Sequence, residues 1–153
     1  MQEIEGASPQ QWSELGDMAS QMRNWDAAIR AYNMALRGTL GPNLEMQVCW
    51  NCALAIWFRA GFAEREDTNT TNEEWIEIMA AKALYRQMLS IYETKLMSGP
   101  AQPQSHKLYQ YAKDNLVDSR RYSISREPDG TLIPRVESAN FSLDDWFEKQ
   151  GTF

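Results

Sequence analysis

Two consecutive stretches with helical spacing, between residues 12 and 36, constrain the fold of this chain more than any other feature. Residues three and four apart in a helix share one face, so apolar side chains at these steps form a stripe. The stretches therefore predict two helices, each with one apolar face available for packing. The apolar positions are Trp12, Leu15, Ala19 and Met22 in the first stretch, and Trp25, Ala28, Ile29, Tyr32, Ala35 and Leu36 in the second.

Small residues stand where the two expected helices would cross. Gly16 lies in the first helix and Ala28 in the second. A glycine inside a helix costs about 1 kcal/mol relative to alanine, so Gly16 indicates a packing requirement. A bulky side chain at either place would push the helix axes beyond their usual separation of about 8–10 Å. The sequence therefore predicts a close helical hairpin.

Local signals mark the ends of these two helices. Ser8, which is followed by a proline, is a typical N-cap for the first helix. Asn24 is placed to cap the second helix. Gly38, and then Gly41 with Pro42, are expected to end it.

Five of these residues have the spacing of a known repeat, whose outline is W-x2-L-G-x2-Y, A-x3-F and a closing proline. They are Trp12, Leu15 and Gly16, then Ala28 and Tyr32, and Pro42 follows as a closing proline. The stretch thus resembles a tetratricopeptide repeat, although Ala19 replaces the usual aromatic residue and the proline comes two residues late. The resemblance implies two antiparallel helices that stack on another helix pair and hold a partner protein. The alternative is an ordinary helical hairpin with chance matches.

Three further helices are expected after this hairpin. Ala81-x-x-x-Tyr85 has the spacing of Ala28-x-x-x-Tyr32, which indicates a second, degenerate repeat. The last of the three resembles either the first helix of a third repeat or the solvating end helix of such arrays. The expected elements are a third helix over residues 44–60 ended by Gly61, a polar loop over 62–72, a fourth helix over 73–97, and a fifth helix over 104–121.

The character of the chain changes after the fifth helix. Residues 127–131 are a strong turn signal, so the arms 122–125 and 131–133 are expected to form a small hairpin. Pro134 confines the second arm to an edge strand or an extended segment. Further on, Ser142 is a typical N-cap and predicts one helical turn, with Asp145 as the capping acid.

The expected fold is therefore all-α. It contains two degenerate repeats of the tetratricopeptide type, an end helix, and an irregular C-terminal extension with a small hairpin and one short helix. The expected domains are a helical repeat domain over residues 8–121 and an extension, or arm, over residues 122–153.

Net charge and composition argue against several classes of function. The 153 residues have a net charge of -6, whereas nucleic-acid binding needs a basic patch. No stretch approaches the roughly 20 apolar residues that cross a bilayer, and no basic and apolar leader is recognised. The 2 cysteines form no disulfide framework. We expect a cytoplasmic or otherwise intracellular protein that neither binds nucleic acid nor inserts into a membrane.

The third expected helix carries an aromatic face. Trp50, Leu54 and Trp57 recur at helical spacing, and Phe58 lies beside them. In tetratricopeptide repeats the first helix of each repeat lines a concave groove, and the resemblance extends this role to these side chains and to Asn51. One interpretation is an aromatic-lined groove for an apolar helix or strand, because exposed aromatic patches mark contacts. The other is a helix that is simply buried in the core.

No group of residues predicts catalysis or metal binding. Cys49 and Cys52 have C-x-x-C spacing but lie in mid-helix without further ligands, which favours packing over a redox or zinc role. His106 has no acid or nucleophile arranged around it. Ser13 and Asp17 stand where some family members use basic residues to clamp a terminal carboxylate, which argues against such a ligand. We expect no enzyme activity, no cofactor and no metal.

The favoured function is a protein–protein interaction adaptor or scaffold that binds a helix or an extended segment in the aromatic-lined groove. The alternative is a structural subunit of a larger multi-protein particle that uses its C-terminal tail as an arm. Such arrays usually need about three repeats to bury a continuous core, so association with itself or with the subunits of a complex is expected. The residues expected to bind a partner are Trp50, Asn51, Leu54, Trp57, Phe58, Tyr109, Phe141, Trp146 and Phe147.

Overall fold

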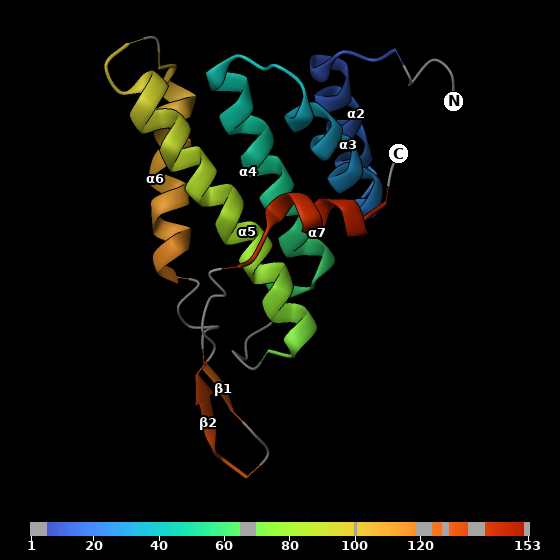
Figure 1. The fold of residues 1–153 in the computed structure, drawn as a ribbon, viewed down its shortest axis with the longest axis vertical. Coiled ribbons are helices and arrows are strands. Elements are labelled where there is room, and N and C mark those ends of the chain that lie inside the picture. Colours follow the sequence, from blue (N-terminus) through green and yellow to red (C-terminus); the bar gives the residue numbers. More distant parts are fainter. Residues whose placement is uncertain are drawn as a thin grey trace.

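The computed structural model describes residues 6–64, 70–99, 101–118, 124–126, 129–134 and 140–151. Over these residues the protein has an all-α fold with one short β-hairpin, which confirms the expected fold class (Figure 1). The elements, in chain order, are α2 (Pro9–Gln21), α3 (Trp25–Arg37), α4 (Pro42–Arg59), the 3-10 turn η1 (Phe62–Glu64), α5 (Asn72–Ile91), the π-helical turn η2 (Tyr92–Leu96), α6 (Pro103–Asp118), β1 (Ile124–Arg126), β2 (Leu132–Pro134) and α7 (Leu143–Lys149).

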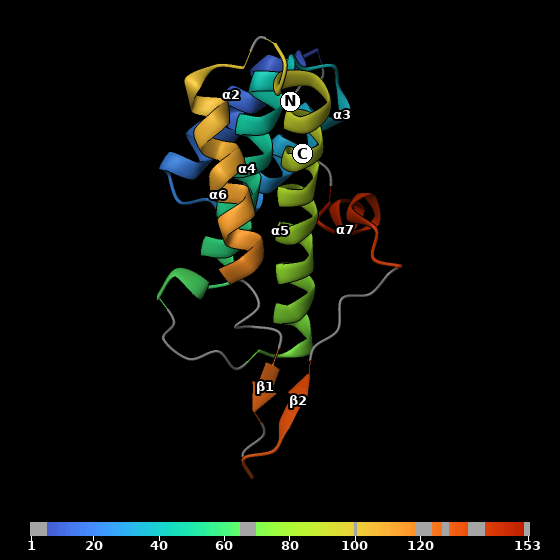
Figure 2. The same ribbon diagram turned by 90° about the vertical axis from the view of Figure 1, so that its left-hand side faces the viewer.

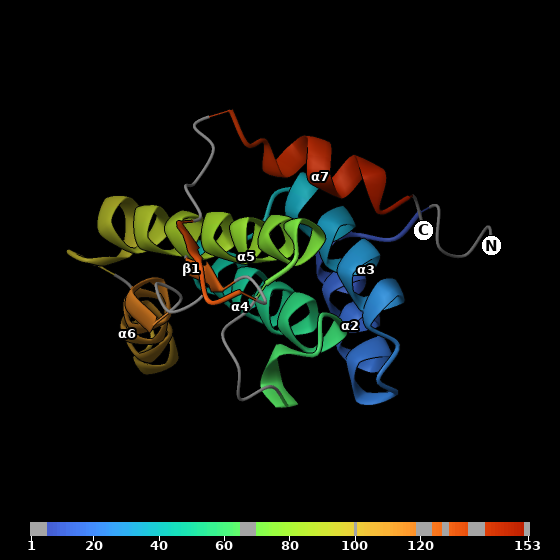
Figure 3. The same cartoon turned by 90° about the horizontal axis from the view of Figure 1, so that it is seen from below.

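The helices form two layers. Viewed from below in Figure 3, α2, α4 and α6 lie on one side, and α3 and α5 lie on the other. Each helix packs mainly on its neighbours in the chain, α2 on α3, α3 on α4, α4 on α5 and α5 on α6. The short helix α7 returns to the outer side of α5, away from α6 (Figure 2).

The ends of the first hairpin confirm the expected caps. Ser8 Oγ accepts a hydrogen bond from the Gln11 backbone N–H at 3.2 Å, and Gln11 Oε1 accepts one from the Ser8 backbone N–H at 2.7 Å. Asn24 Oδ1 accepts a hydrogen bond from the Ala27 backbone N–H at 3.3 Å. These side chains satisfy donors that every helix start leaves unpaired. Gly38 is the C-cap of α3, also as expected.

The small residues of the first hairpin lie in its packed interface. Gly16 is buried, and a Cβ added there would lie 2.6 Å from Cδ1 of the Tyr32 ring. Ala28 is fully buried in the same core. The expected close approach of the two helices is therefore confirmed, since the hydrogen-only side chain of Gly16 leaves the space that Tyr32 occupies.

Pro42 begins a helix, which corrects the expectation that it helps to end the preceding one. Gly41 is the N-cap of α4, and Pro42 occupies its first turn. Proline suits this position because its missing N–H would have no partner within the helix. The third helix therefore starts two residues before the expected residue 44, and it ends before Gly61, whose φ is +78°.

The fourth and fifth helices also differ slightly from the expected ranges. The fourth is α5, which begins at Asn72 after the N-cap Thr71, and the side chains of Thr71 and Glu74 form a capping box. It changes from α to π geometry at Tyr92, within the expected range 73–97. The fifth is α6, and the expected residues 119–121 lie outside the described part of the chain.

The C-terminal elements confirm the expected hairpin and the short helix. β1 and β2 pair antiparallel, with Ser125 opposite Ile133. The expected arm residues 122–123 are not among the described ones. Ser142 Oγ accepts a hydrogen bond from the Asp145 backbone N–H at 3.2 Å and so caps α7.

One large core and one small core hold these elements together. The large core includes residues of α2 to α6, with Trp146 and Phe147 of α7. The small core consists of Phe62, Trp75 and Ile78. The expected polar loop over residues 62–72 therefore starts with a buried aromatic anchor; residues 65–69 of that loop are not described. The short helix α7 belongs to the large core because the side chains of Trp146 and Phe147 are buried there.

Candidate functional site: a groove between α2 and α4

A hollow of about 540 Å³ lies between α2 and α4, beside the start of α3. We call it the α2–α4 groove. Its lining residues are Asp17, Ser20, Gln21, Trp25, Tyr32, Gln47, Asn51, Leu54, Ala55 and Phe58.

Helical spacing explains why these side chains meet. On α4, Gln47, Asn51, Leu54 and Phe58 follow one another at steps of three and four residues, so they share one face. On α2, the lining residue Asp17 is followed by others three and four residues later. The two helices face each other in one layer, and the floor between them is supplied by α3.

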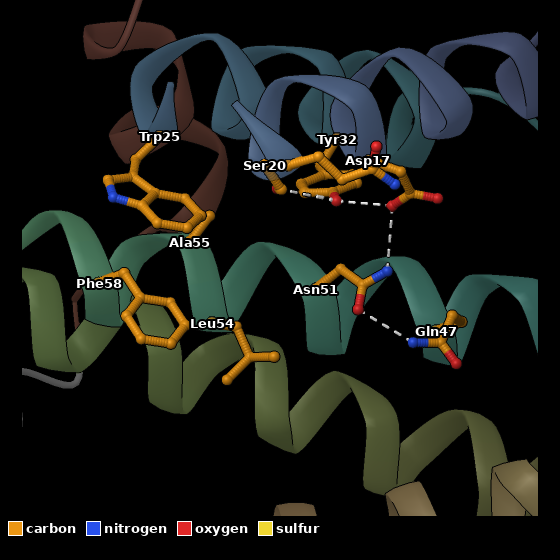
Figure 4. A pocket seen from close by; sticks show the side chains of 10 residues that line it. Asp17, Ser20, Trp25, Tyr32, Gln47, Asn51, Leu54, Ala55 and Phe58 are labelled. Carbon is orange, nitrogen blue, oxygen red and sulfur yellow. Dashed lines mark hydrogen bonds between the residues drawn. The ribbon is translucent and has the colours of Figure 1, made fainter. Parts of the chain in front are cut away.

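The groove has a polar end and an aromatic end (Figure 4). At the polar end, Asp17 Oδ1 accepts a hydrogen bond from Tyr32 Oη at 2.7 Å and one from Asn51 Nδ2 at 3.3 Å. Gln47 Nε2 donates to Asn51 Oδ1 at 3.0 Å, and the hydroxyls of Ser20 and Tyr32 lie 3.2 Å apart. This connected network joins α2, α3 and α4 and fixes the orientation of the Asp17 carboxylate.

Tyr32 stays protonated and donates to Asp17. Its ring is almost fully buried. Burial raises the pKa of the Tyr32 hydroxyl far above its usual range; the hydrogen bond with Ser20 opposes this shift, and the Asp17 carboxylate adds to it.

At the aromatic end, the rings of Trp25 and Phe58 stack with 5.1 Å between centroids and 17° between planes. Phe58 remains 44% exposed. Leu54 and Ala55 of α4 complete the apolar part of the lining. Aromatic and aliphatic groups that stay open to solvent beside polar ones are typical of the centre of a protein-binding surface.

Three of the expected partner-binding residues line this groove: Asn51, Leu54 and Phe58. Trp50 and Trp57, the two other expected residues on α4, lie outside the groove. Trp50 is half-buried between the rings of Tyr85 and Tyr111, at centroid distances of 5.9 and 5.6 Å. Trp57 packs on Phe62 at 4.7 Å, against the small core. The aromatic face of α4 is therefore divided among three environments.

The four other expected residues lie away from the groove. Tyr109 is 8% exposed, stacks on Tyr92 at 4.2 Å and donates to Glu93 Oε2 at 2.9 Å. Phe141 and Trp146 line a second hollow of about 440 Å³ between α7 and α5. Phe147, like Trp146, is buried in the large core. A role of these four in partner binding stays a prediction.

The groove also uses residues that the sequence analysis did not select for binding. Trp25 and Tyr32 were assigned only to the packing face of their helix, and Asp17 only to an argument against a carboxylate clamp. Gln47 precedes Asn51 by four residues, and this spacing alone could have placed it on the same face. Ser13, in contrast, is buried and does not line the groove.

The other residues considered for chemistry have structural surroundings. Cys49 and Cys52 are free and buried, and burial raises the pKa of both thiols well above their usual range. A thiol kept protonated in this way is a poor nucleophile. His106 Nδ1 lies 2.8 Å from the Tyr92 hydroxyl. Among the described residues, no group of three or more acidic, histidine or cysteine side chains could hold a metal ion.

Comparisons with known proteins leave the family open. No family model, no curated protein and no solved structure matches the chain. The resemblance to tetratricopeptide repeats therefore stays a prediction from the residues. In the described part of the chain, no helix has the length and apolar character needed to span a bilayer.

Proposed function

We propose that this protein is a non-enzymatic adaptor or scaffold that binds a segment of another polypeptide in the α2–α4 groove. The observation that carries the proposal is the stack of Trp25 on Phe58 in the groove, with Phe58 44% exposed. A large aromatic side chain left partly open next to a hollow offers apolar area that a ligand can bury.

The composition of the lining favours a polypeptide as the ligand. Three carboxamides, those of Gln21, Gln47 and Asn51, line the groove beside the aromatic pair. Each carboxamide has both donors and an acceptor, as the backbone of a peptide does. A peptide can therefore bury apolar side chains at one end of the groove and pair its polar groups at the other. The two free cysteines fit the reducing interior of a cell, where we expect the protein to act.

The alternative function, a particle subunit with its tail as an arm, gains no support from the position of α7. Trp146 is 5% exposed and lies on the body of its own chain, where it is not available to a neighbour. This alternative predicts insolubility or obligate association, whereas the adaptor is expected to run as a monodisperse monomer in size-exclusion chromatography without its partner.

A selection from random peptides tests the proposed function. The full chain is used to select binders from a displayed library of random dodecapeptides, and the enriched peptides are then measured by fluorescence polarisation. Phe58→Ala is expected to weaken the binding of enriched peptides by about tenfold, since truncating an aromatic anchor commonly costs more than 1 kcal/mol. Met97→Ala is the matched control because Met97 is 58% exposed and does not line the groove.

The control separates specific binding from general attachment to exposed apolar groups. Equal losses from Phe58→Ala and Met97→Ala would contradict the proposal. Failure of the library to yield any peptide that depends on Phe58, with the fold intact by circular dichroism, would contradict it as well.

A further inference from the structure

Asp17 is the one charged side chain among the lining residues of the α2–α4 groove. It is half-buried, and both of the hydrogen bonds that it accepts go to Oδ1, from Tyr32 and from Asn51. An ionised carboxylate has about four acceptor positions on its two oxygens. Among the described residues, no donor is bonded to Oδ2, so half of this carboxylate is available to a ligand.

In the described part of the chain, no ion pair involves Asp17. The described ion pairs join Arg59 to Asp26 and Arg59 to Glu77. A carboxylate that is partly removed from water needs hydrogen bonds or a cation to offset the loss of hydration. Tyr32 and Asn51 supply hydrogen bonds but no positive charge. The α2 helix that carries Asp17 contains no lysine or arginine at all.

We propose that the segment bound in the α2–α4 groove carries a lysine or arginine side chain that pairs with Asp17. This inference rests on the proposed function and names the chemistry of its partner. A guanidinium or ammonium group donates to Oδ2 and supplies the missing positive charge, and such charge-assisted hydrogen bonds are stronger than neutral ones. The overall net charge of -6 attracts the same class of ligand at longer range.

The separation between Asp17 and the aromatic end sets the spacing of the ligand. Asn51, which is bonded to Asp17, and Phe58 at the aromatic end are seven residues apart on α4. At a rise of 1.5 Å per residue this corresponds to about 10 Å. An extended peptide covers about 10 Å in three residues. The ligand is therefore a basic side chain with an apolar side chain about three residues away, the apolar one lying against Trp25 and Phe58.

Asp17→Asn tests the inference on the dodecapeptides that depend on Phe58. Asparagine keeps an oxygen that can accept from Tyr32, so the variant removes the charge and preserves the internal hydrogen bond. We expect these peptides to be enriched in lysine or arginine, and Asp17→Asn to weaken their binding by about tenfold. Glu14→Gln is the matched control, because Glu14 is an exposed carboxylate on the same helix that does not line the groove. Its effect is expected to stay below about twofold.

The outcomes separate this inference from the proposed function. Phe58-dependent peptides that carry no excess of basic residues, or that bind Asp17→Asn as well as the unchanged protein, would overturn the inference and leave the groove as a binding site. The absence of any Phe58-dependent peptide would overturn both.

Discussion

Gly16 has an effect far larger than its size, because it determines how closely α2 approaches α3. The Tyr32 ring fills the space next to Gly16, and its hydroxyl is bonded to Asp17 on α2 and so cannot turn away freely. The same tyrosine lines the α2–α4 groove. The smallest side chain in the hairpin therefore supports both the packing of the core and the position of the carboxylate at the polar end of the groove.

Gly16→Ala is expected to destabilise the protein by about 1–3 kcal/mol, because a methyl group forced into a packed interface shifts its neighbours. The gain in helix propensity, about 1 kcal/mol, offsets only part of this cost. The measurement is the free energy of unfolding from urea denaturation. Gly99→Ala is the control, since a Cβ at Gly99 meets nothing within 4 Å. A Gly16→Ala protein as stable as the unchanged one would show that the interface is looser than the structure indicates.

Residue patterns predicted some groove residues and missed others for a physical reason. Asn51, Leu54 and Phe58 could be selected because they share one face of a single helix. Trp25 and Tyr32 belong to the packing stripe of another helix, and only the crossing of the helices shows that their edges also reach the groove. Spacing within one helix gives the face of a side chain, whereas the neighbours on that face depend on tertiary packing.

At the scale of the elements, Arg59 at the end of α4 connects three other helices. Its guanidinium bonds Asp26 of α3 at 3.0 Å and Glu77 of α5 at 2.6 Å. It also donates to Gln150 Oε1, just after α7, at 2.8 Å, and lies 5.6 Å from the centre of the Trp146 ring. Arg59 and Asp26 directly follow Phe58 and Trp25, the two stacked aromatics of the groove, in sequence. The contacts of Arg59 therefore stabilise both the docking of α7 and the aromatic end of the groove.

Arg59→Met is expected to lower the free energy of unfolding by about 1–3 kcal/mol, because the half-buried Glu77 loses its cation and α7 loses its polar contacts. Amide hydrogen exchange over α7 is expected to become faster, since this short helix depends on tertiary contacts for its stability. Arg37→Met serves as the control because Arg37 is exposed and has no ion pair among the described residues. Unchanged exchange over α7 would show that Trp146 and Phe147 hold the helix without Arg59.

Helix starts were predictable where a side chain caps the helix, and less predictable where packing decides. Ser8, Asn24 and Ser142 were identified from sequence because their side chains bond the backbone locally. Pro42 was assigned to the end of a helix although it begins one, because proline fits both a stop and a first turn and its neighbours in space decide between them. The docking of α7 on α5 could not be predicted, since its burial requires a surface formed by distant parts of the chain.

At the scale of the whole molecule, the core encloses several groups that lose a proton at high pH. Burial raises the pKa of the thiols of Cys49 and Cys52 and of the hydroxyl of Tyr85 well above their usual range. Tyr32 is affected in the same way. In the unfolded chain these groups ionise near pH 8.5 for thiols and about 10 for tyrosines. Folding is therefore coupled to keeping four acidic groups protonated.

The sign of this coupling predicts alkaline destabilisation. A group whose pKa is raised by folding stabilises the native state below its unfolded pKa, and this contribution is lost as the pH rises, because the unfolded chain releases its protons first. We expect the urea midpoint to stay constant from about pH 7 to 8 and to fall steadily between about pH 9 and 11. In Tyr85→Phe the decline above about pH 10 is expected to be shallower. A midpoint independent of pH up to 11 would contradict the burial of these groups.

The position of the bound segment is tested most directly by nuclear magnetic resonance. The uniformly 15N-labelled full chain is titrated with a Phe58-dependent dodecapeptide, and the shifts of the backbone amides are followed. Binding between α2 and α4 predicts the largest shifts at and around Asp17, Asn51 and Phe58, with little change along α7. The largest shifts on α7 and the adjoining face of α5, with the α2–α4 groove unaffected, would contradict it.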